Sequence, residues 1–343
     1  MSFFESSSRP LAVLGAGSWG TAVAIALARN GHESFLWGRD PQLIDRIRQT
    51  RRNETYLGDI EIPVAVEACA DLDKVLQSAR DIFIAIPSAA FPSFINSLQD
   101  RLKPGSRLIS LTKGLEMETA DTLDRVIARM LGESTPQAVV SGPTFAREVA
   151  RGLPTAVTVA ARPQSLAQVV AGWLHGPGLR AYTSDDMIGV ELGGALKNVL
   201  AIAVGIADGL GMGANARAAL ITRGLAELSR LYRAAGARSE TLMGLSGVGD
   251  LVLTCTDDQS RNRRLGMAIG KRQSLDEALH AIGQAVEGAT TARIVPVLIR
   301  RYGIELPICE QVHYVLYEGV SASEAVERLL AREPKDEPGT FCR

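Results

Sequence analysis

The sequence predicts an α/β fold, in which an N-terminal domain built on a doubly wound parallel sheet is followed by a mostly α-helical domain. The chain has 343 residues, and at ~150 residues per domain this length favours two domains. Its first half alternates short apolar runs with amphipathic helical patterns, which is typical of parallel sheets whose strands are joined by helices. After Ile188 the strand-like runs fade and the pattern becomes helical.

The expected strands are short apolar runs bounded by turn residues. Amphipathic helices are expected between them, such as Thr21–Asn30, Pro41–Arg51 and Asp121–Leu131, and another helical pattern starts near Pro163. The last two strands flank that pattern, so the sheet should extend to about residue 185. The runs interpreted as strands are Leu11–Leu14, Ser34–Trp37, Val64–Val66, Ile82–Ile86, Leu108–Leu111, Ala138–Ser141, Ala156–Ala160 and Arg180–Thr183.

A domain boundary is expected at Asp185–Gly189, giving domains over residues 1–188 and 189–332 and a tail, 333–343, that is rich in Pro and charge and expected to be flexible. The apolar stretch Leu192–Ala207 is shorter than the ~20 residues of a membrane span and contains a lysine and an asparagine. We interpret it as a buried helix. The helical pattern of the second domain is broken at Gly209–Gly213, Gly236, Gly244–Gly249 and Pro307.

The composition excludes several classes of protein. Hydrophobic residues make up 46% and charged residues 22%, unlike disordered, collagen-like or coiled-coil chains. A net charge of -1 provides no global basic field for nucleic acid or an anionic membrane. The 4 Cys and 4 His form no C-x-x-C or H-E-x-x-H pattern, so no metal site is expected. The polar N-terminus, Met1–Pro10, lacks a signal-peptide core, so a cytoplasmic location is expected.

A glycine motif follows the first expected strand and opens the first expected helix. Gly15 permits a tight turn, Gly17 lets the backbone approach a pyrophosphate, and Gly20 lets helix and strand pack closely. The N-terminus of the helix adds unpaired N–H groups for the anion. This context predicts a Rossmann-type dinucleotide site, although an ordinary glycine turn is the alternative.

The second strand ends near Arg39 and Asp40, where NAD enzymes usually place an acid against the ribose 2′-hydroxyl. Because arginine can pair with a 2′-phosphate, we expect NADPH to be accepted. The neighbouring acid Asp40 would suit the 2′-hydroxyl of NADH, so NADH stays an alternative coenzyme. A solvated surface arginine is the alternative.

Two further strand ends offer polar groups where open α/β sheets bind ligands. Lys113 follows Leu108–Leu111 and precedes a glycine, so its ammonium can reach a ligand anion or carbonyl. The turn over Ser141–Ala146 offers backbone N–H groups and a hydroxyl. A solvated lysine and a simple turn are the alternatives.

Lys197 is the most informative single residue. Its helical neighbours at i±3 and i±4 are Gly193, Gly194, Leu200 and Ala201, so its face is small and apolar. Desolvation lowers the pKa of an ammonium toward neutrality, which suits proton transfer to a carbonyl or from an alcohol. The alternative is that the side chain snorkels to the surface.

An acid, Asp250, follows the flexible turn at Gly247–Gly249, and an Arg-Asn pair, Arg261 and Asn262, follows shortly. A guanidinium and an amide suit a phosphate group, and the acid could orient or tune an adjacent lysine. Because Arg263 and Arg264 come next, a solvated basic turn is the alternative.

Taken together and in order, the motifs resemble those of bacterial NAD(P)-dependent glycerol-3-phosphate dehydrogenase. They are Gly-Ala-Gly-Ser-Trp-Gly, Thr-Lys-Gly, Ser-Gly-Pro-Thr-Phe-Ala, Glu-Leu-Gly-Gly-Ala-Leu-Lys-Asn-Val, Gly-Asp-Leu-Val-Leu-Thr and Ser-Arg-Asn. The resemblance covers about Leu11 to Leu330. It implies reduction of dihydroxyacetone phosphate to sn-glycerol 3-phosphate for phospholipid synthesis, by a cytoplasmic homodimer.

The resemblance also implies roles for individual residues. Lys197 matches the family's proton donor and acceptor, and Asp250, Asn198 and Thr254 are expected with it in the catalytic group. In Ala285–Gly288, Ala285 replaces a bulkier apolar residue, which puts that cofactor contact in doubt. The expected cofactor residues are Gly15, Gly17, Ser18, Trp19, Gly20, Arg39, Lys113, Ala146, Arg261, Ala285 and Glu287. The expected substrate residues are Lys113, Gly142, Thr144, Lys197, Asp250, Ser260, Arg261 and Asn262.

The hypothesis is that hydride passes from nicotinamide to the ketone carbon while Lys197 donates a proton, Lys113 adds positive charge, and Arg261 and Asn262 hold the phosphate. Two alternatives stay open. One is a 6-phosphogluconate or 3-hydroxyacid dehydrogenase, which shares the plan and a Lys-Asn pair. The other is a dinucleotide sensor without catalysis, which would need neither Lys197 nor Asp250.

Overall fold

The structure, a computed structural model, describes residues 9–333, which divide into two compact units. The sheet unit comprises the described residues up to Thr112 together with Leu123–Met187. The helical unit comprises Lys113–Thr122 and the described residues from Ile188 onward. The polar segment 1–8 and the expected tail, apart from Glu333, lie outside the described residues.

The sheet unit contains one eight-stranded sheet of order β3-β2-β1-β4-β5-β6-β7-β8. Neighbouring strands are parallel except for the antiparallel pair β6 and β7. The strands are β1 (Leu11–Leu14), β2 (Ser34–Trp37), β3 (Val66–Cys69), β4 (Asp81–Ile84), β5 (Arg107–Ser110), β6 (Gln137–Ser141), β7 (Thr155–Arg162) and β8 (Leu179–Ser184).

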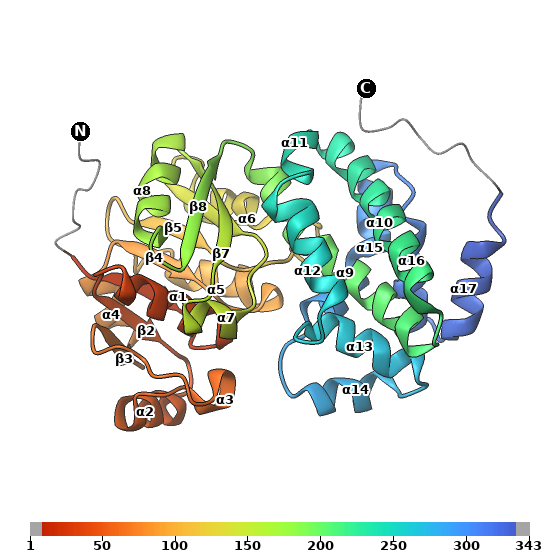
Figure 1. Ribbon diagram of the computed structural model, residues 1–343. Helices are drawn as coiled ribbons and strands as arrows, with labels where there is room; N and C mark the ends of the chain where they lie inside the picture. Colours follow the sequence, from red (N-terminus) through yellow and green to blue (C-terminus); the bar gives the residue numbers. More distant parts are fainter. Residues whose placement is uncertain (1–8, 334–343) are drawn as a thin grey trace. The chain divides into compact units, whose positions relative to one another are not determined.

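Helices pack on both faces of this sheet, because alternate side chains of its inner strands are apolar on both sides. In β1, Leu11 and Val13 join one core cluster, whereas Ala12 and Leu14 join the other. The helices of this unit, visible in Figure 1, are α1 (Ser18–Arg29), α2 (Pro41–Thr50), α3 (Glu54–Leu57), α4 (Leu72–Ser78), α5 (Phe91–Leu98), α6 (Leu123–Leu131), α7 (Ala146–Arg151) and α8 (Gln164–Leu174), with a short 3-10 turn at Ser88–Ala90.

The mostly parallel, doubly wound sheet confirms the predicted fold class, but three details of the prediction are wrong. The expected strand Val64–Val66 is Val66–Cys69, because Val64 lies in a turn and is 95% exposed, while the exposed Glu67 interrupts the apolar run. The helix expected from Asp121 begins at Leu123, because Asp121 belongs to the helical unit.

The third error concerns the direction of β7, which runs antiparallel to β6. The intervening helix α7 has 6 residues, and at 1.5 Å per residue it extends only about 9 Å. That is shorter than the five-residue strand β6, which at ~3.3 Å per residue extends about 16 Å. The chain therefore re-enters the sheet near the end of β6, where Ser141 pairs with Thr158.

The helical unit confirms the helical pattern of the second half of the chain. Breaks fall at the expected glycines, and Gly236 ends α10 in the left-handed conformation. Its helices are α9 (Met187–Gly209), α10 (Gly213–Ala235), α11 (Ser239–Leu242), α12 (Asp250–Thr256), α13 (Arg261–Gly270), α14 (Leu275–Ile282), α15 (Glu287–Tyr302), α16 (Pro307–Tyr317) and α17 (Ala322–Leu330), with a π-helical turn at Leu245–Gly249.

Helices α9 and α13 meet at backbone distance through two glycines on each helix. A Cβ added to Gly205 would lie 2.2 Å from the Arg263 carbonyl oxygen, and one added to Gly266 would lie 2.1 Å from the Ile202 carbonyl oxygen. Gly209 and Gly270 face one another in the same way. This close packing sets the N-terminus of α13 against the middle of α9.

Helix α9 is long and apolar enough to cross a membrane by length and composition, but 94% of its most apolar window is buried inside the structure. It is a core helix, as predicted for Leu192–Ala207. Among residues 9–333 no group of three His, Cys, Asp or Glu side chains could hold a metal ion, and Cys69, Cys255 and Cys309 are buried free thiols.

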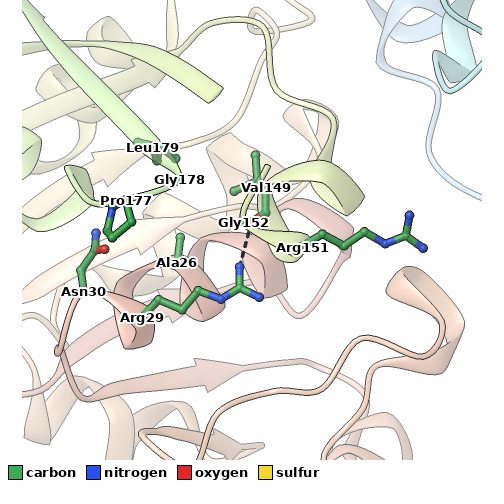
Figure 2. A pocket seen from close by; sticks show the side chains of 9 residues that line it. All are labelled: Ala26, Arg29, Asn30, Val149, Arg151, Gly152, Pro177, Gly178 and Leu179. Carbon is green, nitrogen blue, oxygen red and sulfur yellow. Dashed lines mark hydrogen bonds between the residues drawn. The ribbon is translucent and has the colours of Figure 1, made fainter. Parts of the chain in front are cut away.

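The C-termini of α1 and α7 and the start of β8 line a surface pocket of about 390 Å³, drawn in Figure 2. Arg29 donates a hydrogen bond to the Val149 carbonyl oxygen at 3.2 Å, which satisfies an acceptor near the end of α7. Asn30 donates to the carbonyl oxygens of Trp173 and Leu174, at 2.9 and 3.0 Å, at the end of α8. These polar side chains therefore serve helix termini.

We expect Asn30→Asp to lower the free energy of unfolding by ~2–3 kcal/mol, because it removes the donor from two helix-end carbonyls and places a negative charge at a helix C-terminus. The matched control is Asn96→Asp, an exposed residue in the last turn of α5. It adds the same charge near a helix C-terminus and should lower stability by no more than ~1 kcal/mol. Urea unfolding monitored by circular dichroism measures both, and equal stability of the two variants would contradict the assigned capping role.

Candidate functional site

The turn after β1 has the geometry of a phosphate-binding loop. Gly15 has a φ of +124°, and a Cβ there would lie 2.3 Å from the Ala85 carbonyl oxygen at the end of the adjacent strand β4. A Cβ on Gly20 would lie 2.0 Å from the Gly15 carbonyl oxygen. In contrast, a Cβ on Gly17 would meet nothing within 4 Å. Steric exclusion by the protein's own backbone therefore explains why positions 15 and 20 require glycine, whereas Gly17 faces open space.

These residues fit a dinucleotide. Gly17 is the N-cap of α1 without a side-chain hydrogen bond, so the N–H groups of the first turn, beginning at Ser18, remain available to an anion. Trp19 has a buried indole Nε1 with no hydrogen-bond partner among residues 9–333. The loop also lies between β1 and β4, where the strand order reverses and open α/β sheets bind ligands.

The two charged residues after β2 have different surroundings. Asp40 caps α2 by accepting a hydrogen bond from the Gln42 N–H at 2.9 Å, and Pro41 at the first helical position favours this start. Arg39 is exposed. The acid is thus engaged by its own helix, while the arginine faces solvent.

In the helical unit, one carboxylate contacts two lysines. Lys197, in the middle of α9, pairs with Oδ1 of Asp250, while Lys113 donates to Oδ2 at 2.7 Å. The Asp250 side chain is 1% exposed, against 7% for Lys197 and 16% for Lys113. Asp250 is the first residue of α12, where the helix dipole favours a carboxylate.

The surroundings of Lys197 shift its proton affinity. Burial lowers the pKa of Lys197 from 10.5 to about 7, the positive charge of Lys113 acts in the same direction, and the carboxylate of Asp250 opposes them. Thr254, one turn after Asp250, accepts a hydrogen bond from the ammonium at 2.9 Å. Burial raises the pKa of the nearby Cys255 to about 12, so this side chain stays a neutral thiol.

Asn198 contacts the second predicted cluster rather than the lysines. Its Oδ1 accepts from Nδ2 of Asn262 at 2.8 Å, and its own amide donates to the Gly194 carbonyl oxygen at 3.2 Å. Oδ1 of Asn262 in turn accepts from the backbone N–H of Gly288 at 2.8 Å. The asparagine pair thus joins α9, α13 and α15.

Ser260 and Arg261 stand at the N-terminus of α13. The Ser260 hydroxyl caps this helix by accepting from the Arg263 N–H at 3.2 Å, and Arg261 donates to Oε1 of Gln284 at 3.4 Å. Arg263 is not part of a solvated basic turn, because it is buried and pairs with Asp208 at 2.6 Å. Ala285 is exposed and Glu287 half-buried in the segment that follows Gln284.

The remaining predicted residues lie after β6 in the sheet unit. Gly142 has a φ of +145°, and a Cβ there would lie 3.0 Å from the Ala156 carbonyl oxygen, so the backbone geometry requires glycine. The Thr144 hydroxyl donates to the Gly142 carbonyl oxygen at 3.1 Å. Ala146 begins α7.

Sequence reasoning missed several partners in the site. Gln284 accepts a hydrogen bond from Arg261, and the backbone N–H of Gly288 donates to Asn262. Cys255 lies close enough to Lys197 for the lysine charge to lower the pKa of the thiol, against the larger effect of burial. Thr254, which the sequence places in the expected catalytic group, does contact Lys197. No local pattern indicates a backbone N–H as the partner of an asparagine.

Comparisons with known proteins agree over nearly the full length. The family model described as NAD-dependent glycerol-3-phosphate dehydrogenase N-terminus matches residues 10–167, and the corresponding C-terminus model matches residues 186–327. The glycerol-3-phosphate dehydrogenase (NAD(P)+) of Thioalkalivibrio sulfidiphilus is 57% identical over 331 residues, covering 96% of this chain and 99% of that protein. The enzyme of the same name from Nitrosococcus oceani is 54% identical, covering 95% and 94%.

Solved structures give the same relationship. The crystal structure of glycerol-3-phosphate dehydrogenase from Coxiella burnetii superposes with a TM-score of 0.92 at 46% identity, covering 94% of this chain and 99% of that one. A ketopantoate reductase from Ralstonia eutropha, 19% identical with a TM-score of 0.59, shares the fold alone.

We expect Gly17→Ala and Gly20→Ala to separate ligand binding from folding. The first variant should keep the wild-type melting temperature but raise the KM for NADPH at least ~10-fold, because its Cβ enters the space where the backbone can approach a pyrophosphate. The second should lose ~3 kcal/mol or more of stability, because its Cβ overlaps the Gly15 carbonyl. Steady-state kinetics and thermal unfolding test both variants. An unchanged KM for NADPH in Gly17→Ala would contradict a pyrophosphate site at this turn.

Proposed function

Because this chain belongs to the NAD(P)-dependent glycerol-3-phosphate dehydrogenase family, we propose that Lys197, Asp250, Thr254 and Lys113 form its catalytic group. The enzyme interconverts dihydroxyacetone phosphate and sn-glycerol 3-phosphate with NAD(P) as coenzyme. This relationship sets aside the 6-phosphogluconate or 3-hydroxyacid dehydrogenase and the non-catalytic sensor that the sequence left open.

The observation that carries the proposal is the desolvated ammonium of Lys197 beside Asp250. A general acid works best when its pKa is near the working pH, and burial brings the pKa of Lys197 to about 7. The hydrogen bonds to Asp250 and Thr254 fix the direction of the amine. Lys197 can therefore donate a proton to a carbonyl oxygen and take one back from an alcohol.

Reduction of the ketone requires a hydride on carbon and a proton on oxygen. Bound NAD(P)H supplies the hydride and is oxidised to NAD(P)+. In our proposal Lys197 delivers the proton to the oxygen as the C–O double bond becomes a single bond. The side chain of Lys197 is then a neutral amine. Lys113 keeps a positive charge near the developing alkoxide, and Asp250 holds both lysines in place.

We assign the phosphate of the substrate to the N-terminus of α13. Arg261 contributes a guanidinium, Asn262 an amide whose second N–H is not used within residues 9–333, and the helix dipole adds partial positive charge. Ser260 would act here mainly through its cap on α13. Asn198 then supports the phosphate site, because it fixes the orientation of the Asn262 amide.

We assign the dinucleotide to the sheet unit, with Gly15–Gly20 at the pyrophosphate and Arg39 at a 2′-phosphate. Trp19 and Ala146 are further proposed cofactor residues of this unit, whereas Gly142 and Thr144 are proposed substrate residues. In the helical unit, the family resemblance supports Ala285 and Glu287 as cofactor residues. The exposed guanidinium of Arg39 and the engagement of Asp40 as a helix cap support acceptance of NADPH.

The wider setting follows from the resemblance to bacterial enzymes of this family. We propose a cytoplasmic homodimer whose product supplies glycerophospholipid synthesis. The net charge of -1 supports a small-molecule substrate rather than nucleic acid as the partner.

We expect kcat/KM for reduction to fall as the pH rises through about 7, because Lys197 must then be protonated, and the rate of glycerol 3-phosphate oxidation to rise over the same range. The charged and titratable groups that act on Lys197 are Asp250, Lys113 and Cys255, and the thiol, with a pKa of about 12, does not titrate there. Lys197→Met should lose this inflection and at least ~10²-fold in kcat.

The control for this experiment is Lys271→Met, which removes an exposed lysine after α13. It should leave both the rate and the pH profile unchanged. The substrate phosphate titrates near pH ~6, and any inflection from that source persists in every variant. Turnover of Lys197→Met within a few-fold of wild type would refute the proton-transfer role.

We expect Arg39→Gln to raise the KM for NADPH ~10-fold and to leave that for NADH within ~2-fold, because only NADPH offers a 2′-phosphate for a charge-assisted hydrogen bond. Arg46→Gln, on the exposed side of α2, is the matched control for loss of surface charge. If Arg39→Gln altered both KM values equally, Arg39 would not be the residue that reads the 2′-phosphate.

A further inference from the structure

The segment 113–122 carries Lys113 and packs as part of the helical unit. Its side chains Leu115 and Ala120 are each 1% exposed and belong to the apolar core of that unit, with Met117 packed against the same core. The first residue of the segment, Lys113, donates to Asp250. We call residues 113–122 the lysine loop.

Internal hydrogen bonds close the lysine loop. The Ala120 N–H donates to the Glu116 carbonyl oxygen at 3.0 Å, and the Glu116 N–H donates to the Asp121 carbonyl oxygen at 2.9 Å. Ala120 has a φ of +57°, in the left-handed region that non-glycine residues rarely adopt. The side chain of Thr119 donates to the carboxylates of Glu116 and Asp121. The loop is therefore a folded, conformationally defined turn.

Arg301 on α15 binds the end of the lysine loop opposite Lys113 through two guanidinium nitrogens. One donates to the Thr119 carbonyl oxygen at 2.6 Å, and the other donates to Oδ1 of Asp121, also at 2.6 Å. The Arg301 side chain is 29% exposed and that of Asp121 14%. A planar guanidinium that binds a carbonyl and a carboxylate together fixes orientation as well as distance.

We propose that Arg301 is a positioning residue of the enzyme, which clamps the lysine loop to α15 and thereby holds Lys113 against Asp250. The inference rests on the proposed role of Lys113. A lysine side chain has four rotatable bonds and loses entropy when it is held in one place. The position of the Lys113 backbone therefore determines how often its ammonium contacts the Asp250 carboxylate. Apolar packing of Leu115 and Ala120 fixes the depth of the loop, and Arg301 fixes its far end.

This role differs from a general contribution to stability. Partly exposed ion pairs contribute little to the free energy of folding, whereas small displacements of a catalytic group reduce the rate strongly, by up to ~10²-fold for about 1 Å. Loss of the clamp should therefore affect turnover far more than the melting temperature. It should also affect the pH profile, because the charge of Lys113 is one of the causes that lower the pKa of Lys197, together with burial and against Asp250.

The test is a double-mutant cycle with Arg301→Gln and Lys113→Met in the full-length enzyme, assayed with dihydroxyacetone phosphate and NADPH. We expect Arg301→Gln to lower kcat/KM ~10-fold, to lower the melting temperature by no more than ~4 °C, and to move the pH inflection upward. In the Lys113→Met background the same change should cost less than ~2-fold. Arg300→Gln, which removes the exposed neighbour on α15, is the matched control.

Amide hydrogen exchange separates the clamp from the role of Lys113. Arg301→Gln should speed exchange in residues 113–122 relative to the rest of the helical unit. Unchanged turnover, or an equal loss with and without Lys113, overturns the proposal. If Lys113→Met alone has no effect, the proposed role of Lys113 is wrong and this inference falls with it, even where faster exchange shows that the clamp exists. If Arg301→Gln fails to fold, Asp121→Asn removes the carboxylate partner and makes the same comparison.

Discussion

One buried carboxylate, that of Asp250, accepts hydrogen bonds from two ammonium groups, and the helical unit is organised around this contact. A buried carboxylate without a cation would carry a large desolvation penalty, and two neighbouring cations without an anion would repel each other. The three groups are therefore stable only together. They come from the lysine loop, the middle of α9 and the start of α12, so elements far apart in sequence have to meet at one point.

Close approach of backbones to α9 makes this meeting possible. A Cβ on Gly193 would lie 2.4 Å from the Ser246 carbonyl oxygen, in the turn that leads into α12, and one on Gly205 would lie 2.2 Å from the Arg263 carbonyl oxygen in α13. Gly247 in the same turn would clash in a similar way with the Leu242 carbonyl. Asp250 thus follows a turn, and Asn262 lies on a helix, that packs directly against the backbone of α9, and the two side chains are short enough to reach only what lies beside them.

The sequence predicts those parts of the molecule that depend on local patterns. Helical spacing puts Lys197 on an apolar face, and that face is buried, because the same period governs both the pattern and the packing. The turn at Gly15–Gly20 is predicted because its three glycines lie within six positions of one another, although the carbonyl that excludes a Cβ at Gly15 belongs to the distant Ala85. In contrast, Lys113 and Asp250 are 137 residues apart, and no periodicity links them. The reversed direction of β7 was missed because strand patterns carry no direction.

The sequence does not show whether a small polar residue binds a ligand or stabilises the fold. The sequence predicts Ser260 as a substrate contact and offers Asp40 as a contact that would suit NADH, and both are helix caps in the structure. Gly142 was assigned to the substrate, and its positive φ beside β7 already requires glycine. Caps and turns use the same small polar residues that ligands use, since both supply hydrogen bonds to groups without partners. Sequence alone cannot distinguish them.

The arrangement of the two lysines explains how a proton can leave a buried group without leaving an unpaired charge. When Lys197 is protonated, Lys113, Asp250 and Lys197 together carry one net positive charge, which burial disfavours. After Lys197 has given up its proton, the remaining ammonium of Lys113 still balances the carboxylate. Burial thus favours the donation, whereas a lone Lys197–Asp250 pair would be left with a buried negative charge once the proton had gone. In the proposed mechanism Lys113 therefore does more than attract the substrate, since its fixed charge lets Asp250 hold the amine of Lys197 in both protonation states.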